Sequence, residues 1–419
     1  MHLAGPQRLR VLVLDEEVPW PPNTGKRIRT WNLLRRLSSR HDLHLLTYGP
    51  ATEEARGKLA EHGFTGTILQ PLAPSQGPQF WARLMASAVS QYPYSVIKHF
   101  TARMQDKVTQ LCSSEKFDLV HIEWLPYARY ESPGVPRFIV AHNVESDIWR
   151  RRAEHHGGLI GRCFFGLQAK RMRVFEQRAA AQDTHIAAVS DLDAETFRSY
   201  GAQNVTVVPN GVDLDYFRPR PEVSQSDSLL FVGSLDWYAN EDAVREFALH
   251  VFPLLRSRNP RITFQVVGRR PSDRLIAMLK NVNGVEMVGE VSDVRPYMAQ
   301  ARAVVVPLRI GGGSRIKILE ALAMAKPVIS TAIGAEGLSL TNGRDCLIAN
   351  RPQEFAARVD SLFADPDQQM RLGQNGRALV EQLYGWDAAA ERLELAWADA
   401  AGYPEVCSSS RTHTTVGAR

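Results

Sequence analysis

Ala303-Val-Val-Val-Pro307 is an apolar run typical of a strand, and soon after it the chain reads Gly311-Gly-Gly-Ser-Arg-Ile-Lys-Ile-Leu-Glu-Ala-Leu-Ala-Met-Ala-Lys-Pro-Val-Ile-Ser-Thr331. Consecutive glycines allow a backbone to turn sharply and to approach a ligand closely. Ser314 stands where a helix N-cap belongs, ahead of a run of strong helix formers. This order predicts an anion-binding nest, because unpaired N–H groups and the positive end of the helix dipole face one point.

Charged side chains surround this predicted nest. Arg315 and Lys317 add cations beside it, and Glu320 adds an acceptor for sugar hydroxyls further along the helix. A nucleotide diphosphate-sugar needs both phosphate donors and a hydroxyl acceptor, so the motif favours a ligand of this class. Each feature also has a plainer interpretation. The glycine loop could be an ordinary turn before a helix, and Glu320 could be an i,i+3 partner of Lys317. Arg315 and Lys317 could lie on a solvated basic face.

Length and composition indicate a globular protein with more than one domain. At 419 residues the chain exceeds the size at which one hydrophobic core usually suffices. No apolar run reaches the ~18 residues of a membrane span, and the N-terminal residues lack an apolar signal core. We therefore expect a cytoplasmic location, with the inner face of the cytoplasmic membrane as one option. The four cysteines show no CxxC spacing, which argues against a disulfide framework or a zinc site.

The net charge of +5 is concentrated in the first half of the chain, where Trp149–Arg178 is both basic and apolar. A solvated helix face is the first interpretation of this segment. A peripheral contact with an anionic membrane comes second, because amphipathic basic helices favour anionic lipid. Nucleic-acid binding comes last and is not expected, since no stacking aromatics are interleaved with the basic residues.

Apolar strands alternate with amphipathic helices along the chain, which predicts an α/β fold of two doubly wound, Rossmann-like domains. A polar stretch at Arg218–Ser228 has the composition of a linker. The expected organisation is an N-terminal domain over 1–217, a C-terminal domain over 218–385, a helix over 386–402 that crosses back, and a disordered tail over 403–419. Such sheets bind ligands at the carboxyl ends of their strands, so we expect the site in a cleft between the domains.

Four passages carry a resemblance to a known family: Pro22–Arg29, Pro209–Phe217, Phe231–Asp242 and Gly311–Leu338. With them the chain resembles the retaining GT-B glycosyltransferases of family 4, also called group 1, over roughly Leu9–Ala400. The resemblance is closest to the sugar transferases of bacterial exopolysaccharide export systems. It implies a GT-B fold, a nucleotide-sugar donor held by the second domain, an acceptor held by the first, no cofactor and no obligatory metal.

The resemblance also implies roles for single residues. Glu320 matches the second Glu of the family's Glu-x7-Glu motif, which commonly binds the donor ribose, whereas the first Glu is replaced by Gly312. The Arg and Lys that clamp the diphosphate in many members are not evident after Gly233, so Arg315 and Lys317 are expected to take their place.

The expected site residues fall into two groups. His142 follows an apolar strand, and the resemblance suggests that it contacts the donor sugar. Arg269 lies beside backbone groups that could read the base. The expected catalytic residues are His142, Arg315 and Lys317, and the expected substrate-binding residues are Gly25, Asn143, Gly233, Arg269, Gly311, Gly312, Gly313, Ser314 and Glu320.

The expected activity is transfer of a sugar from a nucleotide diphosphate-sugar to a hydroxyl acceptor, of lipid-linked glycan type, in cell-surface or exopolysaccharide biosynthesis. No pair of carboxylates can be assigned as acid and nucleophile, so a double displacement of the glycosidase type is not supported. The resemblance implies front-face attack with retention instead, in which the leaving phosphate takes the proton of the acceptor. Two alternatives stay open at this point. One is another GT-B enzyme, such as a nucleotide-sugar epimerase or an inverting transferase, and the other is a non-catalytic nucleotide-sugar-binding protein.

Overall fold

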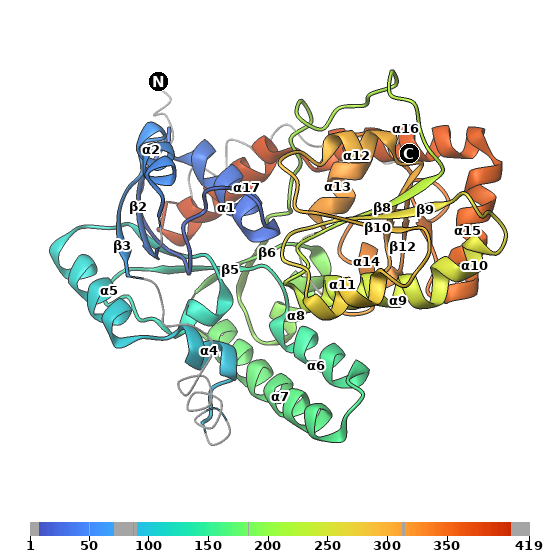
Figure 1. Cartoon of the computed structure of the whole chain (residues 1–419). Coiled ribbons are helices and arrows are strands. Elements are labelled where there is room, and N and C mark those ends of the chain that lie inside the picture. Colours follow the sequence, from blue (N-terminus) through green and yellow to red (C-terminus); the bar gives the residue numbers. More distant parts are fainter. Residues whose placement is uncertain are drawn as a thin grey trace, which may run out of the picture. The chain divides into compact units, whose positions relative to one another are not determined.

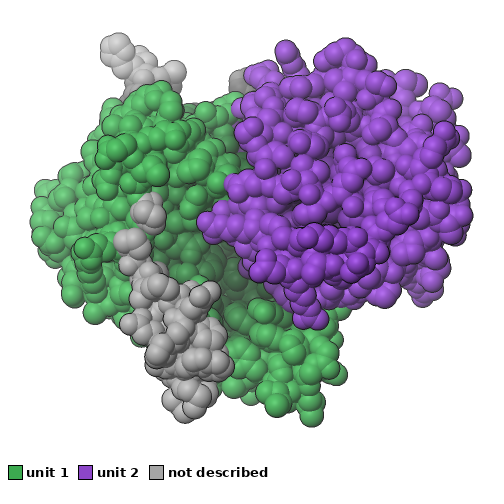
Figure 2. Space-filling model, viewed as in Figure 1, with its two compact units in different colours: residues 1–209, 387–419 green, residues 210–386 purple. Residues whose placement is uncertain are grey.

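The computed structural model describes residues 8–49, 51–70, 87, 90–182, 184–311 and 315–403. The chain divides into two compact units (Figure 2), with residues 1–209 and 387–419 in unit 1 and residues 210–386 in unit 2. Each unit holds one parallel sheet with helices on both of its faces (Figure 1). The expectation of two doubly wound α/β domains is confirmed.

Unit 1 contains a seven-stranded sheet in the order β3-β2-β1-β4-β5-β6-β7, and every neighbouring pair is parallel. Its central strands are apolar on both faces, because helices cover both sides of the sheet. The strands are β1 (Arg10–Leu14), β2 (Asp42–Tyr48), β3 (Thr65–Leu69), β4 (Leu119–Ile122), β5 (Arg137–Ala141), β6 (His185–Ala188) and β7 (Asn204–Val207).

Helices connect these strands, and their starts follow ordinary capping chemistry. The Thr24 hydroxyl caps the first helix by accepting a hydrogen bond from the backbone N–H of Arg27 at 3.2 Å. The described helices of unit 1 are α1 (Gly25–Leu37), α2 (Glu53–Glu61), α4 (Tyr94–His99), α5 (Ala102–Ser114), α6 (Glu145–His155), α7 (Leu159–Ala181), α8 (Asp191–Ser199) and α17 (Trp386–Ala400).

The C-terminal helix α17 packs on unit 1 although it follows unit 2 in the sequence. Trp397 is fully buried, and its indole N–H donates to Nδ1 of His121 on β4 at 3.0 Å. Glu394 adds an ion pair with Arg40 at 2.9 Å and lies 2.8 Å from Nε2 of His41. The helix therefore closes the core of unit 1.

Unit 2 contains a six-stranded parallel sheet in the order β10-β9-β8-β11-β12-β13. Its strands are β8 (Ser228–Val232), β9 (Thr263–Val267), β10 (Val285–Gly289), β11 (Ala303–Val306), β12 (Val328–Ser330) and β13 (Leu347–Ile348). Its described helices are α9 (Tyr238–Glu246), α10 (Phe252–Arg256), α11 (Asp273–Leu279), α12 (Arg295–Gln300), α13 (Ile316–Ala323), α14 (Ala332–Ala335), α15 (Pro352–Ala364) and α16 (Pro366–Leu383).

The boundary between the units lies after Pro209, earlier than the linker composition predicted. Residues 210–217 belong to unit 2 because they pack into its core. The backbone N–H of Val212 donates to the carbonyl of Tyr384 at 2.8 Å, and Arg377 donates to the carbonyl of Phe217 at 2.9 Å. Of the tail expected over 403–419, residues 404–419 lie outside the described residues.

None of the described helices has the length and apolarity needed to cross a membrane.

Replacing Trp397 with Ala should weaken unit 1 selectively. Loss of a fully buried Trp leaves a cavity and removes the donor to His121, and such changes cost about 3–5 kcal/mol. Native-state hydrogen exchange of the β4 amides measures this loss in unit 1 separately from unit 2. Trp237→Ala is the matched control, because Trp237 is 49% exposed and lies in unit 2. Unchanged β4 protection in Trp397→Ala would show that α17 does not support the sheet.

Candidate functional site

Several predicted site residues meet at the carboxyl edge of the sheet in unit 2. Gly233 follows β8, Arg269 follows β9, and Lys317 lies in the first turn of α13, beyond β11. A Cβ added to Gly233 would lie 2.6 Å from Nζ of Lys317, so only glycine permits this approach. The structure thus brings Gly233 and Lys317 together, as expected of residues that share one site.

The ammonium group of Lys317 is held in a defined place. Its Nζ donates to Oδ1 of Asn240 at 2.7 Å and lies 4.3 Å from the centre of the Phe231 ring. The Asn240 amide in turn donates to the carbonyl of Ser234 at 2.8 Å. Sequence reasoning missed Asn240, although it lies within the quoted passage Phe231–Asp242. The one feature of the sequence that could have indicated Asn240 is its position near the start of the helix that follows Gly233.

Burial changes the protonation of two side chains on α13. It lowers the pKa of Lys317 to about 7, and the positive charge of Arg315 adds to this effect. Burial also raises the pKa of Glu320 to about 8, although Lys317 opposes that shift. No ion pair joins Glu320 to Lys317 among the described residues, so an ordinary i,i+3 salt bridge does not explain them. Strongly shifted groups of this kind are typical of functional sites.

Two arginines connect the loops around these groups. Arg315 is buried and donates to the carbonyl of Ile333 at 2.6 Å, which excludes a solvated face for this residue. Arg269 donates through Nε to the hydroxyl of Ser234 at 2.9 Å and lies 3.3 Å from a carboxylate oxygen of Asp236. Arg315 lies close enough to Lys317 to lower its pKa, and Arg269 follows β9 at the same edge of the sheet, so the charges at this edge favour an anion.

The glycine loop is described only at its two ends. Gly311 has a φ of 139°, a conformation that favours glycine, and a Cβ there would lie 3.4 Å from Nη1 of Arg315. Helix α13 begins at Ile316, so its N-cap position belongs to Arg315, whose φ of −97° and ψ of 39° are not helical, and not to Ser314 as predicted. The predicted residues Gly312, Gly313 and Ser314 lie outside the described residues.

A second cluster lies at the carboxyl edge of the sheet in unit 1, around His142. His142 follows β5 and is buried, and its Nε2 donates to the carbonyl of Glu123 at 2.7 Å. The same nitrogen lies 3.3 Å from Oε1 of the Glu123 carboxylate. Burial lowers the pKa of His142, and contacts with Glu123 oppose the shift. With the proton on Nε2, the neutral ring presents Nδ1 as its acceptor.

The Glu123 carboxylate is fixed by a chain of hydrogen bonds that reaches α17. Because the indole N–H of Trp397 donates to Nδ1 of His121, the proton of His121 sits on Nε2, which donates to Glu123 at 2.5 Å. The Thr30 hydroxyl donates to the other carboxylate oxygen at 2.8 Å. Burial would raise the pKa of Glu123, but hydrogen bonds from His121 and His142 outweigh it and hold the pKa well below its ordinary range.

The other predicted site residues of unit 1 are Asn143 and Gly25. The Asn143 amide donates to Glu145 at 3.2 Å, and the indole of Trp124 donates to the same carboxylate at 3.0 Å. Gly25 is the first residue of α1. The next residue, Lys26, forms a close ion pair with Asp15, which follows β1. Sequence reasoning did not single out this pair.

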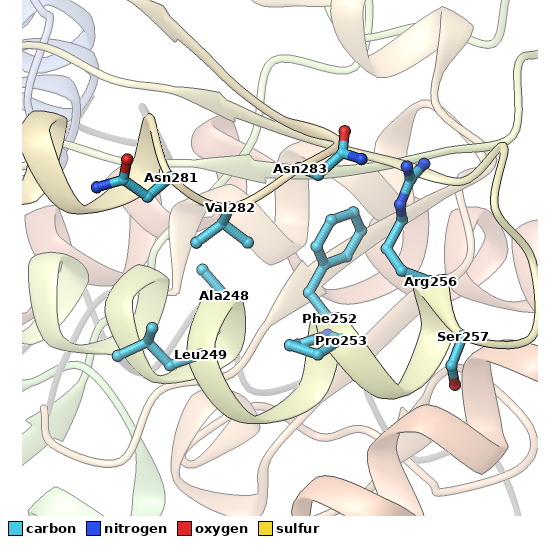
Figure 3. Close-up of a pocket in the computed structure, with 9 residues that line it drawn as sticks. All are labelled: Ala248, Leu249, Phe252, Pro253, Arg256, Ser257, Asn281, Val282 and Asn283. Carbon is cyan, nitrogen blue, oxygen red and sulfur yellow. The ribbon is translucent and has the colours of Figure 1, made fainter.

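A separate groove of about 580 Å³ lies in unit 2 and contains none of the predicted site residues (Figure 3). It is lined by Ala248, Leu249, Phe252, Pro253, Arg256, Ser257, Asn281, Val282 and Asn283. We therefore do not place the candidate site there. Within the described part of the chain, no three His, Cys, Asp or Glu side chains are grouped so that they could hold a metal ion.

Family models match both halves of the chain. Residues 25–216 match the model described as Glycosyltransferase Family 4, and residues 226–365 match the model described as Glycosyl transferases group 1. Together the two matches support a group 1 glycosyltransferase family for this chain.

Individual relatives agree with this class. The chain is 29% identical over 253 residues to a D-inositol 3-phosphate glycosyltransferase of Streptomyces bingchenggensis, covering 54% of each chain. It is 30% identical over 243 residues to a D-inositol 3-phosphate glycosyltransferase of Frankia alni, covering 51% of this chain and 58% of the relative. The chain thus spans about half the length of these curated relatives.

Solved structures match almost the whole chain. HepE of Anabaena, in complex with UDP and glucose, has a TM-score of 0.66 at 14% identity and covers 92% of this chain and 98% of its own. Sucrose-phosphate synthase from Thermosynechococcus elongatus has a TM-score of 0.70 at 15% identity and covers 96% of this chain and 100% of its own. These likenesses show the fold, which is the two-domain, Rossmann-like GT-B fold.

Glu123→Gln keeps the size of the side chain and removes its charge. Because the Glu123 carboxylate favours the protonated form of His142, this change should lower the pKa of His142 further. An NMR titration of the histidine rings measures the shift. The control is Glu17→Gln, which removes a carboxylate that pairs with Arg27 instead. An unchanged or higher pKa of His142 in Glu123→Gln would contradict the assigned contact.

Proposed function

We propose that this protein transfers a sugar from a nucleotide diphosphate-sugar to a hydroxyl acceptor, with retention of configuration at the anomeric carbon. The observation that carries the proposal is the half-buried Lys317, held by Asn240 beside Gly233 and accompanied by Arg315 and Glu320. A cation, a close backbone approach and a hydroxyl acceptor on one sheet edge suit a nucleotide diphosphate. The match to group 1 glycosyltransferases supports the same ligand class.

In the reaction, one bond to the anomeric carbon breaks and a new one forms. The bond from that carbon to the diphosphate oxygen breaks, and its electron pair stays on the leaving diphosphate. The acceptor oxygen forms the new bond, and its proton passes to the diphosphate. Charge therefore develops on the leaving group, where Lys317 and Arg315 would stabilise it. With a pKa of about 8, Glu320 is largely protonated near neutral pH and can both donate to and accept from a ribose hydroxyl.

His142 is the proposed contact for the donor sugar. Its Nε2 is engaged by the Glu123 carbonyl, so the neutral ring offers Nδ1 as an acceptor for a sugar hydroxyl. Asn143, Gly25, Arg269 and Gly311 remain proposed substrate-binding positions, together with Gly312, Gly313 and Ser314. No metal or cofactor is part of the proposal.

A more specific donor and acceptor can also be proposed. HepE of Anabaena was solved with UDP-glucose, so this donor is the first to test. We propose a lipid-linked glycan as the acceptor, in cell-surface or exopolysaccharide synthesis at the cytoplasmic face of a membrane. Transfer with inversion, epimerisation of the donor, or binding without turnover are the outcomes that would replace this proposal, and anomeric NMR of the products separates them.

Lys317→Met should reduce sugar transfer by roughly 100- to 1000-fold, because it removes a cation aimed at the leaving diphosphate. The assay measures release of the nucleoside diphosphate from a panel of nucleotide-sugars with lipid-linked acceptors. Lys280→Met is the matched control, since Lys280 is an exposed lysine of the same unit at the end of α11. Equal activity of the two variants would remove Lys317 from the proposed mechanism.

A further inference from the structure

The connection between β11 and α13 is held before and after its glycine residues by one helix, α9. After the glycines, Nζ of Lys317 donates to Oδ1 of Asn240 at 2.7 Å. Before them, Arg309 donates to the two carboxylate oxygens of Asp242, through Nε at 3.1 Å and Nη2 at 2.9 Å. Asn240 and Asp242 lie two residues apart on α9. The same short stretch of α9 therefore contacts both ends of the connection that carries the glycine loop.

The core of unit 2 fixes the backbone on either side of Arg309. Leu308 and Ile310 are buried in that core. The Thr331 hydroxyl also donates to the carbonyl of Leu308. Because the neighbours of Arg309 point into the core, its side chain points the other way and reaches α9. Arg309 thus links a fixed backbone to a neighbouring helix, so a shift of the connection relative to α9 requires this link to break.

The Asp242 carboxylate makes this link strong and directional. Its side chain is 1% exposed, and a buried carboxylate must be paired to remain charged. The guanidinium of Arg309 meets it with two nitrogens, a geometry that fixes orientation as well as distance. The third nitrogen, Nη1, lies 2.9 Å from a carboxylate oxygen of Glu246. All three nitrogens of Arg309 therefore face protein carboxylates, which favours a positioning role over direct contact with a phosphate.

A second arginine, Arg245, provides an internal comparison. Its Nη2 donates to Asp242 at 2.6 Å and lies 3.2 Å from Glu246. The side chains of Arg245 and Arg309 are both 35% exposed. Arg245 lies on α9 itself, however, so these ion pairs stay within one helix. Loss of either arginine leaves Asp242 paired with the other, but the loss of Arg309 also removes the link between α9 and the connection.

We propose that Asp242 is a positioning residue for donor binding. Through Arg309 it fixes the connection between β11 and α13 against α9, and it thereby keeps Lys317 beside Gly233. Without this link the start of α13 can move away from α9, and the ammonium group no longer meets the leaving diphosphate at the distance it needs. The inference rests on the proposed function in that a diphosphate is the group that Lys317 meets, and it adds a residue that acts without touching the donor.

Calorimetric titration of the full chain with UDP-glucose tests this role. Arg309→Met and Asp242→Asn should each raise the Kd about tenfold, and the double variant should bind no more weakly than either single variant, because both changes remove the same link. Arg245→Met is the matched control and should stay within about twofold of the wild type, since a half-exposed ion pair within one helix contributes little. A Kd that is unchanged or lower in Asp242→Asn would show that Arg309 binds the phosphates itself, and it would overturn the proposal. Equal weakening by Arg245→Met would do the same.

Hydrogen exchange of the free protein tests the same link independently of donor binding. The amides of Ile318 and Leu319 donate to the carbonyl of Arg315 at 2.8 and 3.3 Å in the first turn of α13. They should exchange at least about tenfold faster in the two variants that break the link, but not in the control. Exchange that is unchanged in those two variants, or equally fast in all three, would overturn the proposal. A wild-type chain that binds no UDP-glucose would instead contradict the proposed function, and the exchange rates would then decide whether the link positions α13.

Discussion

Burial of two ionisable side chains on α13 is the constraint on which the candidate site depends. Loss of hydration moves the pKa of Lys317 down to about 7 and that of Glu320 up to about 8, so both groups prefer their neutral forms. Such an arrangement costs stability, and it is found mainly where a ligand makes use of it. A diphosphate beside Lys317 would restore the charge that burial suppresses, so ligand affinity and protonation would be coupled at this lysine.

In both units, residues that are far apart in the sequence hold the proposed site residues in place. In unit 1 the indole of Trp397 fixes the proton of His121, His121 holds the Glu123 carboxylate, and Glu123 holds His142. The C-terminal helix therefore connects to His142, a proposed site residue, through His121 and Glu123. In unit 2 the equivalent support is shorter, since one residue, Asn240, bridges Lys317 and the loop after β8 within the part of the chain that the structure describes.

The sequence predicts the strands and their parallel arrangement well, because local apolar runs and β/α alternation carry that information. It predicts Gly233 and Lys317 as site residues, but it cannot show their approach, which depends on two loops meeting in space. Contacts between residues far apart in the chain, such as Trp397 with His121, leave no local pattern. A π-helical turn over Phe247–Val251 separates α9 from α10, and Pro253 at the start of α10 lacks the N–H that a regular helix needs.

Proton uptake on donor binding tests the coupling at Lys317 most directly. Calorimetric titration with UDP-glucose near pH 8, in buffers of different ionisation enthalpy, measures the number of protons taken up. A nucleotide-sugar does not titrate there, so uptake must come from the protein. With a pKa of about 7, Lys317 is mostly neutral before binding, and uptake should approach one proton. It should disappear in Lys317→Met and persist in Glu320→Gln. Binding without uptake, or the same uptake in Lys317→Met, would contradict the account.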